Sequence, residues 1–160
     1  MPNWVMGNFK VIGVKENIQK FLLNQLELVD FSGNHIGEII VENDIFKAPI
    51  LGTSYRTFHI KDTYRYFIEP FVIDFSKLKE NEKGDITLNL YIKGAWVIRH
   101  EPLVEISKKY NLSFFIEAEE ESGEFEQVIC IRNGELVVND EIILNEEDEW
   151  CDEGDERNEE

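Results

Sequence analysis

The chain contains few of the residues that build cross-linked, metal-binding or membrane-spanning proteins. Its two cysteines, Cys130 in an apolar run and Cys151 in an acidic run, are too few for a disulfide framework or a zinc site. The three histidines, His35, His59 and His100, are widely separated and show no metal-ligand spacing. No apolar run approaches the roughly 20 residues that span a bilayer. We therefore expect no metal, no cofactor and no membrane anchor.

The N-terminus also lacks the basic start and apolar stretch of a signal peptide, since it reads MPNWVMGNFK. This absence predicts a cytoplasmic protein. Hydrophobic residues nevertheless make up 42% of the 160 positions, which is enough for one domain with a buried core.

Positive charge is scarce at one end of the chain. The net charge is −17, yet residues 1–110 hold 14 basic and 14 acidic residues and are therefore neutral. Residues 111–160 hold 2 basic and 19 acidic residues, so they carry the whole imbalance. Ten of the acids fall in residues 146–160. This distribution predicts a folded domain at 1–145 followed by an acidic tail at 146–160.

Hydrophobic periodicity predicts the elements outside the middle of the chain. Apolar stripes at helical spacing predict helices over 15–28 and 102–110. Alternating patterns predict strands over 9–14, 85–94 and 112–120, and a hairpin over 123–138 that turns at Asn133-Gly134. Ile142 to Leu144 extend the last strand. We interpret residues 27–85 as an insertion with short strands within 27–34, 38–44 and 66–75.

This order of elements predicts an α+β fold. A strand and helix, an insertion, and a second strand, helix and strands match the ferredoxin-like arrangement, an antiparallel sheet with two helices on one face. The insertion would supply the second strand or decorate the edge of the sheet.

Residues at both ends of this predicted domain resemble a known family. Met1-Pro2-Asn3-Trp4, followed by Asn8, Val11 and Gly13, is similar to the start of the YubB-like family of ferredoxin-like proteins of phages and plasmids. The second half resembles the family's ending through Trp96, Pro102, Leu103, Ile106, Ser107, Tyr110, Leu112, Phe114, Gly123, Phe125 and Asn133-Gly134. Val5 stands where the family has cysteine, and 27–85 matches nothing in it. The resemblance implies a fold and a mobile-element origin, and it supplies no catalytic residues.

The stretch Gly94–Tyr110 gathers Trp96, Arg99, His100 and Glu101. A His–Glu pair beside an Arg is a pattern of acid–base catalysis. However, His100 and Glu101 are sequence neighbours whose side chains should diverge, and no Ser or Cys nucleophile lies near them. We interpret the stretch as a joint between strand and helix, with Trp96 on the core edge, Arg99 solvated and His100 or Glu101 capping the helix. We expect a protein that is not an enzyme.

A second candidate is the segment 55–67, where aromatic and basic residues interleave. Such a pattern offers rings for bases and charges for phosphates of single-stranded nucleic acid. The residues are Tyr55, Arg56, Phe58, Lys61, Tyr64, Arg65 and Tyr66. The structural alternative is a pair of edge strands with the aromatics in the core. Asp62 and the acidic tail make direct nucleic-acid binding the less favoured reading.

The acidic tail supports our leading hypothesis, an accessory protein that binds and inhibits a host protein in the host cytoplasm. Dense carboxylates imitate a phosphate backbone and fit the channel of a nucleic-acid-handling defence enzyme. The candidate contact residues are Glu146, Glu147, Asp148, Glu149, Trp150, Asp152, Glu153, Asp155 and Glu156. The tail can also be a solubilising end, or can fold over the segment 55–67. A third function is binding of a small molecule such as a nucleotide through the insertion and the sheet. The oligomeric state stays open.

Overall fold

The computed structural model describes residues 2–49 and 56–144. Strands account for 51% of these residues and helices for 19%, so β-structure dominates the fold. The strands form one sheet of nine and one sheet of three, and neighbouring strands in both are antiparallel.

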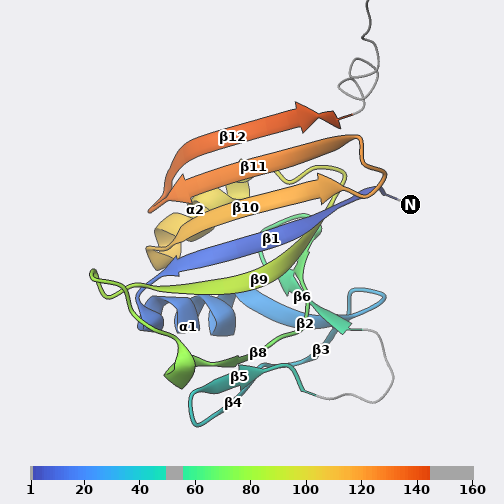
Figure 1. The fold of residues 1–160 in the computed structure, drawn as a ribbon. Coiled ribbons are helices and arrows are strands. Elements are labelled where there is room, and N and C mark those ends of the chain that lie inside the picture. The colour runs from blue at the N-terminus through green and yellow to red at the C-terminus, as the bar shows by residue number, and fades with distance from the viewer. Residues whose placement is uncertain (1, 50–55, 145–160) are drawn as a thin grey trace, which may run out of the picture.

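The nine-stranded sheet is the main body of the molecule, and in Figure 1 its strands are stacked one below another from the top of the view. In spatial order the strands are β12 (Glu135–Ile143), β11 (Phe125–Arg132), β10 (Ser113–Glu120), β1 (Trp4–Gly13), β9 (Ile86–Ala95), β7 (Tyr66–Ile68), β6 (Arg56–Ile60), β2 (Leu26–Asp30) and β3 (His35–Gly37). The short β7 pairs with the last residues of β9 on one side and with β6 on the other, and beyond it the sheet turns away from the plane of β12 to β9.

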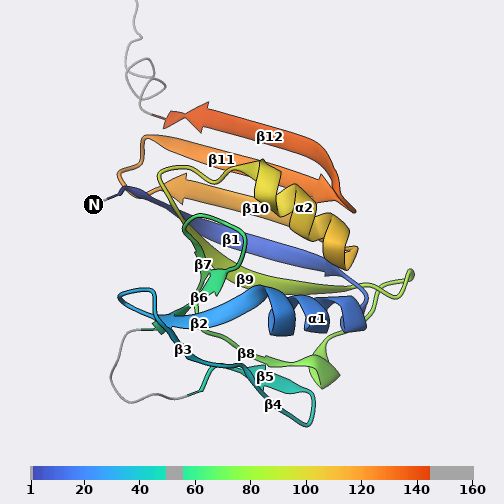
Figure 2. The same ribbon diagram turned by 180° about the vertical axis from the view of Figure 1, so that it is seen from behind.

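Two helices cover one face of this sheet, as Figure 2 shows. They are α1 (Lys15–Gln25) and α2 (His100–Tyr110). The apolar stripe predicted for the first helix is confirmed, because Ile18, Phe21 and Leu22 are buried. The helix ends earlier than predicted, since Leu26 already begins β2.

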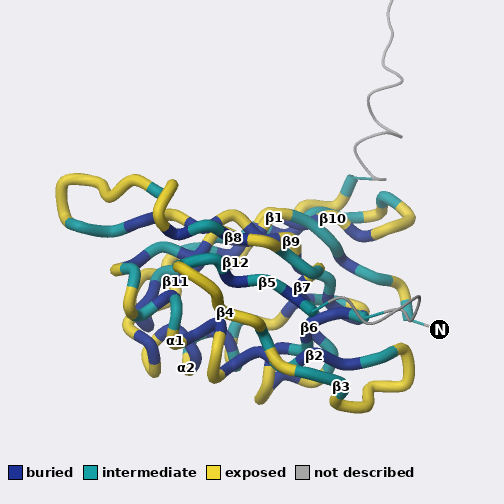
Figure 3. Tube along the Cα trace, turned by 90° about the horizontal axis from the view of Figure 1, so that it is seen from below, coloured by how far each residue is buried: buried dark blue, intermediate teal, exposed yellow. Residues whose placement is uncertain are grey.

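The core lies between the sheet and the helices, where strand alternation brings one apolar face of each central strand. The Phe114 ring of β10 lies 5.0 Å from the Phe9 ring and 5.7 Å from the Phe21 ring, which joins β1, β10 and α1. Figure 3 shows buried residues along the strands and exposed residues in the turns. Every second residue of β9 is buried from Ile86 to Ile92, which confirms the half-buried strand predicted there.

The three-stranded sheet packs beside α1. Its order is β4 (Ile40–Glu42), β5 (Ile45–Lys47) and β8 (Val72–Asp74), and a 3-10 helix, η1 (Phe75–Lys77), follows β8. Phe46 and Phe75 pack edge to face at 4.9 Å, and Lys15 of α1 pairs with Asp44 at 3.3 Å. Residues 27–85 therefore contribute to both sheets and to the common core.

The predicted ferredoxin-like α+β class is wrong. That class has a small sheet in which the strand after the first helix lies directly beside the third strand. Here the hairpin of β6 and β7 separates β9 from β2, and β11 and β12 widen the sheet on its other side. The second, three-stranded sheet also has no place in that class. The insertion was expected to supply the second strand or to decorate the edge of the sheet. It supplies β2, β6 and β7 inside the main sheet and β3 at its edge, and it also forms the separate sheet of β4, β5 and β8.

The C-terminal hairpin is confirmed, with Asn133 and Gly134 both at positive φ, 49° and 89°. The Gly94–Tyr110 stretch joins a strand to a helix, as predicted, since β9 ends at Ala95 and α2 begins at His100.

Three details of this joint differ from the prediction. Trp96 is 56% exposed at a φ of 70°, because it is the central residue of a tight turn in which the Val97 N–H donates to the Ala95 carbonyl at 2.8 Å. Arg99 is the N-cap and no side chain caps the helix there. His100 Nε2 lies 3.5 Å from Glu101 Oε2, so these side chains approach each other in the first turn, where we expected them to diverge.

Candidate functional site: a cleft on the open sheet face

The face of the nine-stranded sheet opposite the two helices, here named the open face, carries a cleft of about 810 Å³. The cleft lies where the ends of β1, β9, β7, β6 and β2 meet. The residues that line it include Trp4, His59, Phe67 and Lys93. Strand register brings these residues together, because Lys93 is opposite Phe67 and Phe67 is opposite His59. Residues in such positions share one face of a sheet.

Trp4 gathers two cations in this cleft. The Lys93 Nζ atom lies 4.5 Å from the centre of the Trp4 ring, and the Arg65 Cζ atom lies 5.2 Å from it. Phe67 packs edge to face against the same ring at 6.1 Å. Within residues 2–49 and 56–144, no ion pair involves either Lys93 or Arg65. Two cations held near one ring without a carboxylate partner are suited to bind an anion.

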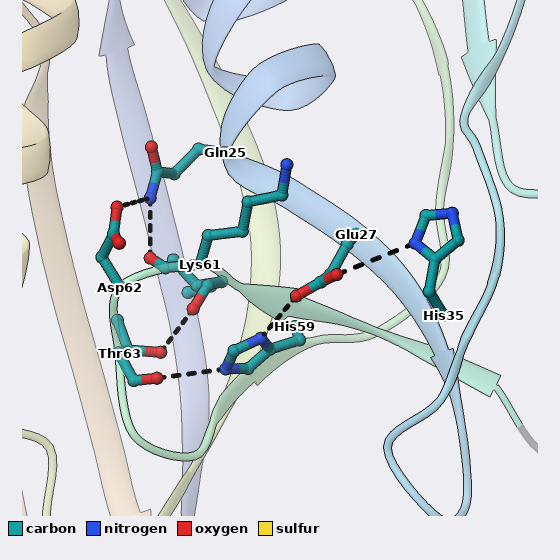
Figure 4. Close-up of polar contacts among 8 residues, drawn as sticks. Gln25, Glu27, His35, His59, Lys61, Asp62 and Thr63 are labelled. Carbon is teal, nitrogen blue, oxygen red and sulfur yellow. Dashed lines mark hydrogen bonds and ion pairs between the residues drawn. The ribbon is translucent and has the colours of Figure 1, made fainter.

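His59 forms the floor of the cleft beside Phe67, with the two rings 5.5 Å apart. Its Nδ1 atom lies 3.1 Å from a Glu27 carboxylate oxygen, and its Nε2 atom lies 3.1 Å from the Thr63 carbonyl oxygen. Figure 4 shows this arrangement, with His35 on the far side of Glu27. Both partners of His59 are acceptors, so only a ring with protons on both nitrogens donates to each of them.

Two aromatic residues stand at the rim. Phe31 is 87% exposed and Tyr64 is 82% exposed, and both line the cleft. Phe31 follows Asp30, whose Oδ1 accepts hydrogen bonds from the N–H groups of Ser32 and Asn34, each at 2.9 Å. The Asn34 hydrogen bond lowers the pKa of Asp30, so this carboxylate stays ionised and closes the loop. Exposed rings beside a cavity can stack on a planar ligand.

Hydrogen bonds from Gln25 hold the loop that carries Tyr64 and Arg65. Gln25, a buried polar residue at the end of α1, donates to the Lys61 carbonyl at 2.6 Å and to the Asp62 carboxylate at 3.1 Å (Figure 4). Its side-chain amide oxygen, Oε1, accepts from the Tyr110 hydroxyl of α2 at 3.0 Å. Both helices thereby hold the turn after β6 in place, which positions one wall of the cleft.

Several acidic residues lie on the part of the open face that β10, β11 and β12 form. Glu119 of β10 lies opposite Met6 of β1 and opposite Glu126 of β11, and Met6 in turn lies opposite Lys93. Glu119 is therefore two strands, or about 10 Å, from Lys93. Glu117 and Asp140 lie on the same face in the next row. A cationic cleft and an acidic surface thus share one face of the sheet.

The structure divides the predicted segment 55–67. Tyr64 and Arg65 line the cleft, whereas Phe58 and Tyr66 are core residues with 1% and 5% exposure. Arg56 lies at a separate hollow of about 410 Å³, beside Pro49 and Phe71.

The remaining predicted residues lie elsewhere. The Lys61 N–H donates to the Gln25 carbonyl, and its side chain is exposed beyond the cleft lining. Tyr55 and all nine predicted contact residues of the tail fall outside the described residues.

Sequence reasoning missed Trp4, Phe31 and Lys93 as site residues. Trp4 and Lys93 had a usable signal, since both stand at the outward positions of strands whose alternate residues are apolar. The signal for Phe31 was weaker, because it is only an aromatic residue inside the turn-forming run Asp30 to Asn34.

Comparison of the chain with protein-family models, with curated proteins and with solved structures found no match. No helix in the part of the chain described here is long and apolar enough to cross a membrane. The same residues contain no group of three or more His, Cys, Asp or Glu side chains placed to hold a metal ion.

Proposed function

We propose that the protein binds a small planar anion of the nucleotide type in the cleft of the open face, without catalysing its conversion. The observation that carries this proposal is the placement of Arg65 and Lys93 over the Trp4 ring without a carboxylate partner among the described residues. Exposed aromatic rings lie beside them at the rim.

Each part of such a ligand has a counterpart in the cleft. A phosphate group binds Arg65 and Lys93, because a guanidinium and an ammonium both donate to phosphate oxygens. The base stacks against Tyr64 and Phe31, whose rings are exposed at the entrance. The volume of about 810 Å³ lies within the range of about 300–1,000 Å³ typical of small-molecule sites.

The charges around the cleft favour a mononucleotide over a nucleic-acid chain. A single strand needs a continuous basic groove that follows several phosphates. Glu119 and Glu126 lie on the open face within a few strands of Lys93 and repel a phosphate backbone that continues across the sheet. The alternative of a single-strand binding module is therefore the weaker one.

Calorimetric titration with the four ribonucleoside 5′-monophosphates, with the matching nucleosides and with a single-stranded oligonucleotide tests the proposal. We expect at least one monophosphate to bind, and to bind more tightly than its nucleoside, because the phosphate contacts the two cations. Lys93→Met should weaken that binding about tenfold, since a hydrogen bond to a charged group contributes about 1.5–3 kcal/mol.

Lys10→Met provides the matched control. Lys10 lies on the same face over the Phe115 ring at 5.9 Å, so the variant loses the same charge outside the cleft. Its affinity for the monophosphate should equal that of the wild type. Equal weakening by both variants would show that net charge alone explains the effect. Absence of any monophosphate binding would refute the proposal. Tighter binding of the oligonucleotide than of the monophosphates would favour the single-strand module.

The hypothesis of an inhibitor of a host protein stays a prediction, as does the mobile-element origin that the family resemblance implies. Its contact residues in 146–160 lie outside the described part of the chain. Capture of one host protein from lysate by the full chain, lost in residues 1–145 and at high salt, would support a docking tail. Capture by both forms would place the contact in the folded body.

A further inference from the structure

The strand β12 forms one edge of the nine-stranded sheet. It has nine residues, which span about 30 Å at about 3.4 Å per residue. Among the described residues it pairs only with β11, so its outer N–H and C=O groups face away from the sheet. Such a row of backbone groups is a template for another strand.

β12 has acidic side chains and one bulge, but it lacks other features that usually protect an edge. Edge strands are commonly short or carry lysine or proline, and β12 is long and contains neither. One bulge occurs where the register shifts between Cys130 and Ile131. Leu136, Val137, Ile142 and Ile143 are each 38–49% exposed. A long edge with exposed apolar side chains is suited to β-augmentation by an extended segment.

The negative charge on β12 and near it indicates which kind of strand can bind at this edge. β12 carries Glu135, Asp140 and Glu141 and no basic residue. The neighbouring strand β11 holds Glu126, and the strand after it, β10, holds Glu117 and Glu119. A second copy of the chain would bring its own Glu135, Asp140 and Glu141 to the same edge, where like charges repel. An added strand with lysine or arginine side chains instead forms cross-strand pairs of opposite charge.

We propose that β12 receives an extended segment of a partner protein in which Lys or Arg alternates with apolar residues. Backbone hydrogen bonds to the outer edge supply the affinity, while Glu135 and Asp140, which lie on the open face of the sheet, pair with the basic side chains. The apolar residues of the segment point to the other face and cover Leu136 and Ile143.

A peptide of alternating Lys and Val with the length of β12 is the probe, and hydrogen exchange of the full chain is the readout. We expect the peptide to protect amides of β12 whose exchange is fast in its absence. An alternating Lys-Pro peptide of equal charge should give no protection, because proline lacks the N–H that the ladder requires. Equal binding of the two peptides would overturn the proposal, since charge alone would explain it.

A variant of the protein with two reversed charges provides a second test of the proposal. Glu135→Lys with Asp140→Lys should weaken the Lys-Val peptide about tenfold, because two attractive cross-strand pairs on the open face become repulsive. Glu80→Lys with Glu82→Lys changes the net charge equally in an exposed turn away from β12, and should leave the affinity unchanged. Equal loss in both double variants would contradict docking at this edge.

Two further outcomes would overturn the proposal. Protection of β12 that appears without peptide and rises with protein concentration would show that a second copy occupies the edge. Protection without peptide that disappears on removing residues 146–160 would show that the chain's own tail covers it. The cleft lies several strands away, so nucleotide binding tests a separate site.

Discussion

At the scale of single residues, Glu120 shows how one carboxylate shapes a turn. It ends β10, and its side chain is buried although it carries a charge. Its Oε1 atom accepts from the N–H groups of Ser122 and Glu124, each at 3.1 Å, and from the Ser122 hydroxyl. The Ser122 hydroxyl bond is the largest cause that lowers the pKa of Glu120 below its ordinary value.

A lowered pKa makes the stabilisation by Glu120 dependent on pH. The contribution is complete above the ordinary glutamate pKa of about 4.3 and disappears as the pH falls through the lowered value in the folded protein. Glu120→Gln should therefore lower the urea midpoint at neutral pH and match the wild type in strong acid. Glu121→Gln, an exposed neighbour, is the control. A difference that persists unchanged in acid would show that shape, rather than charge, explains the loss.

At the scale of elements, the pairing of β1 with β10 depends on a glycine. A Cβ atom at Gly7 would lie 2.0 Å from the Glu117 carbonyl oxygen and 2.5 Å from the Ala118 Cα. Both are backbone atoms, so no side-chain rotation relieves the clash. The two strands lie in the middle of the sheet, between β9 and β11, and join its two halves.

Gly7→Ala should lower the free energy of unfolding by about 1–3 kcal/mol, the usual cost of overpacking. Chemical denaturation followed by far-UV circular dichroism measures the change. Asn8→Ala on the same strand is the control, because Asn8 is exposed on the opposite face. The interpretation would fail if both variants had the stability of the wild type.

Over the whole molecule, charge is distributed unequally across one continuous sheet. The described part of residues 111–144 carries Arg132 against nine acidic residues, and several of the acids share the open face. Glu119 and Glu126 lie directly opposite each other on β10 and β11, and like charges in this position are destabilising. Such an arrangement lowers the stability of the fold and concentrates negative charge on the open face.

Glu119→Gln should raise the free energy of unfolding by roughly 0.2–1 kcal/mol, because it removes one charge of an opposed pair. The gain should shrink in high salt, where exposed charges are screened. Urea denaturation at low and high salt measures both effects. Glu82→Gln removes a charge from an exposed turn and should change the stability less. A gain that is independent of salt would contradict an electrostatic cause.

Part of the candidate site was visible in the sequence and part was not. The segment 55–67 drew attention to Tyr64 and Arg65, which line the cleft. The same pattern included Phe58 and Tyr66, because an aromatic residue in a short strand gives no sign of whether its ring faces the core. Trp4 lies 61 residues and Lys93 lies 28 residues from Arg65 in the sequence. Strand pairing brings them together in the folded chain.

The sequence by itself determined the local elements whose patterns depend on nearby residues. The stripe of α1, the alternation of β9 and the Asn133-Gly134 turn arise from contacts within a few positions, so periodicity and turn chemistry predicted them. Only the tertiary structure decided the order of strands. The hairpin of β6 and β7 pairs with both β9 and β2, although short strands carry little information about which partner they choose. That long-range pairing produced the nine-stranded sheet, the cleft and the open edge of β12.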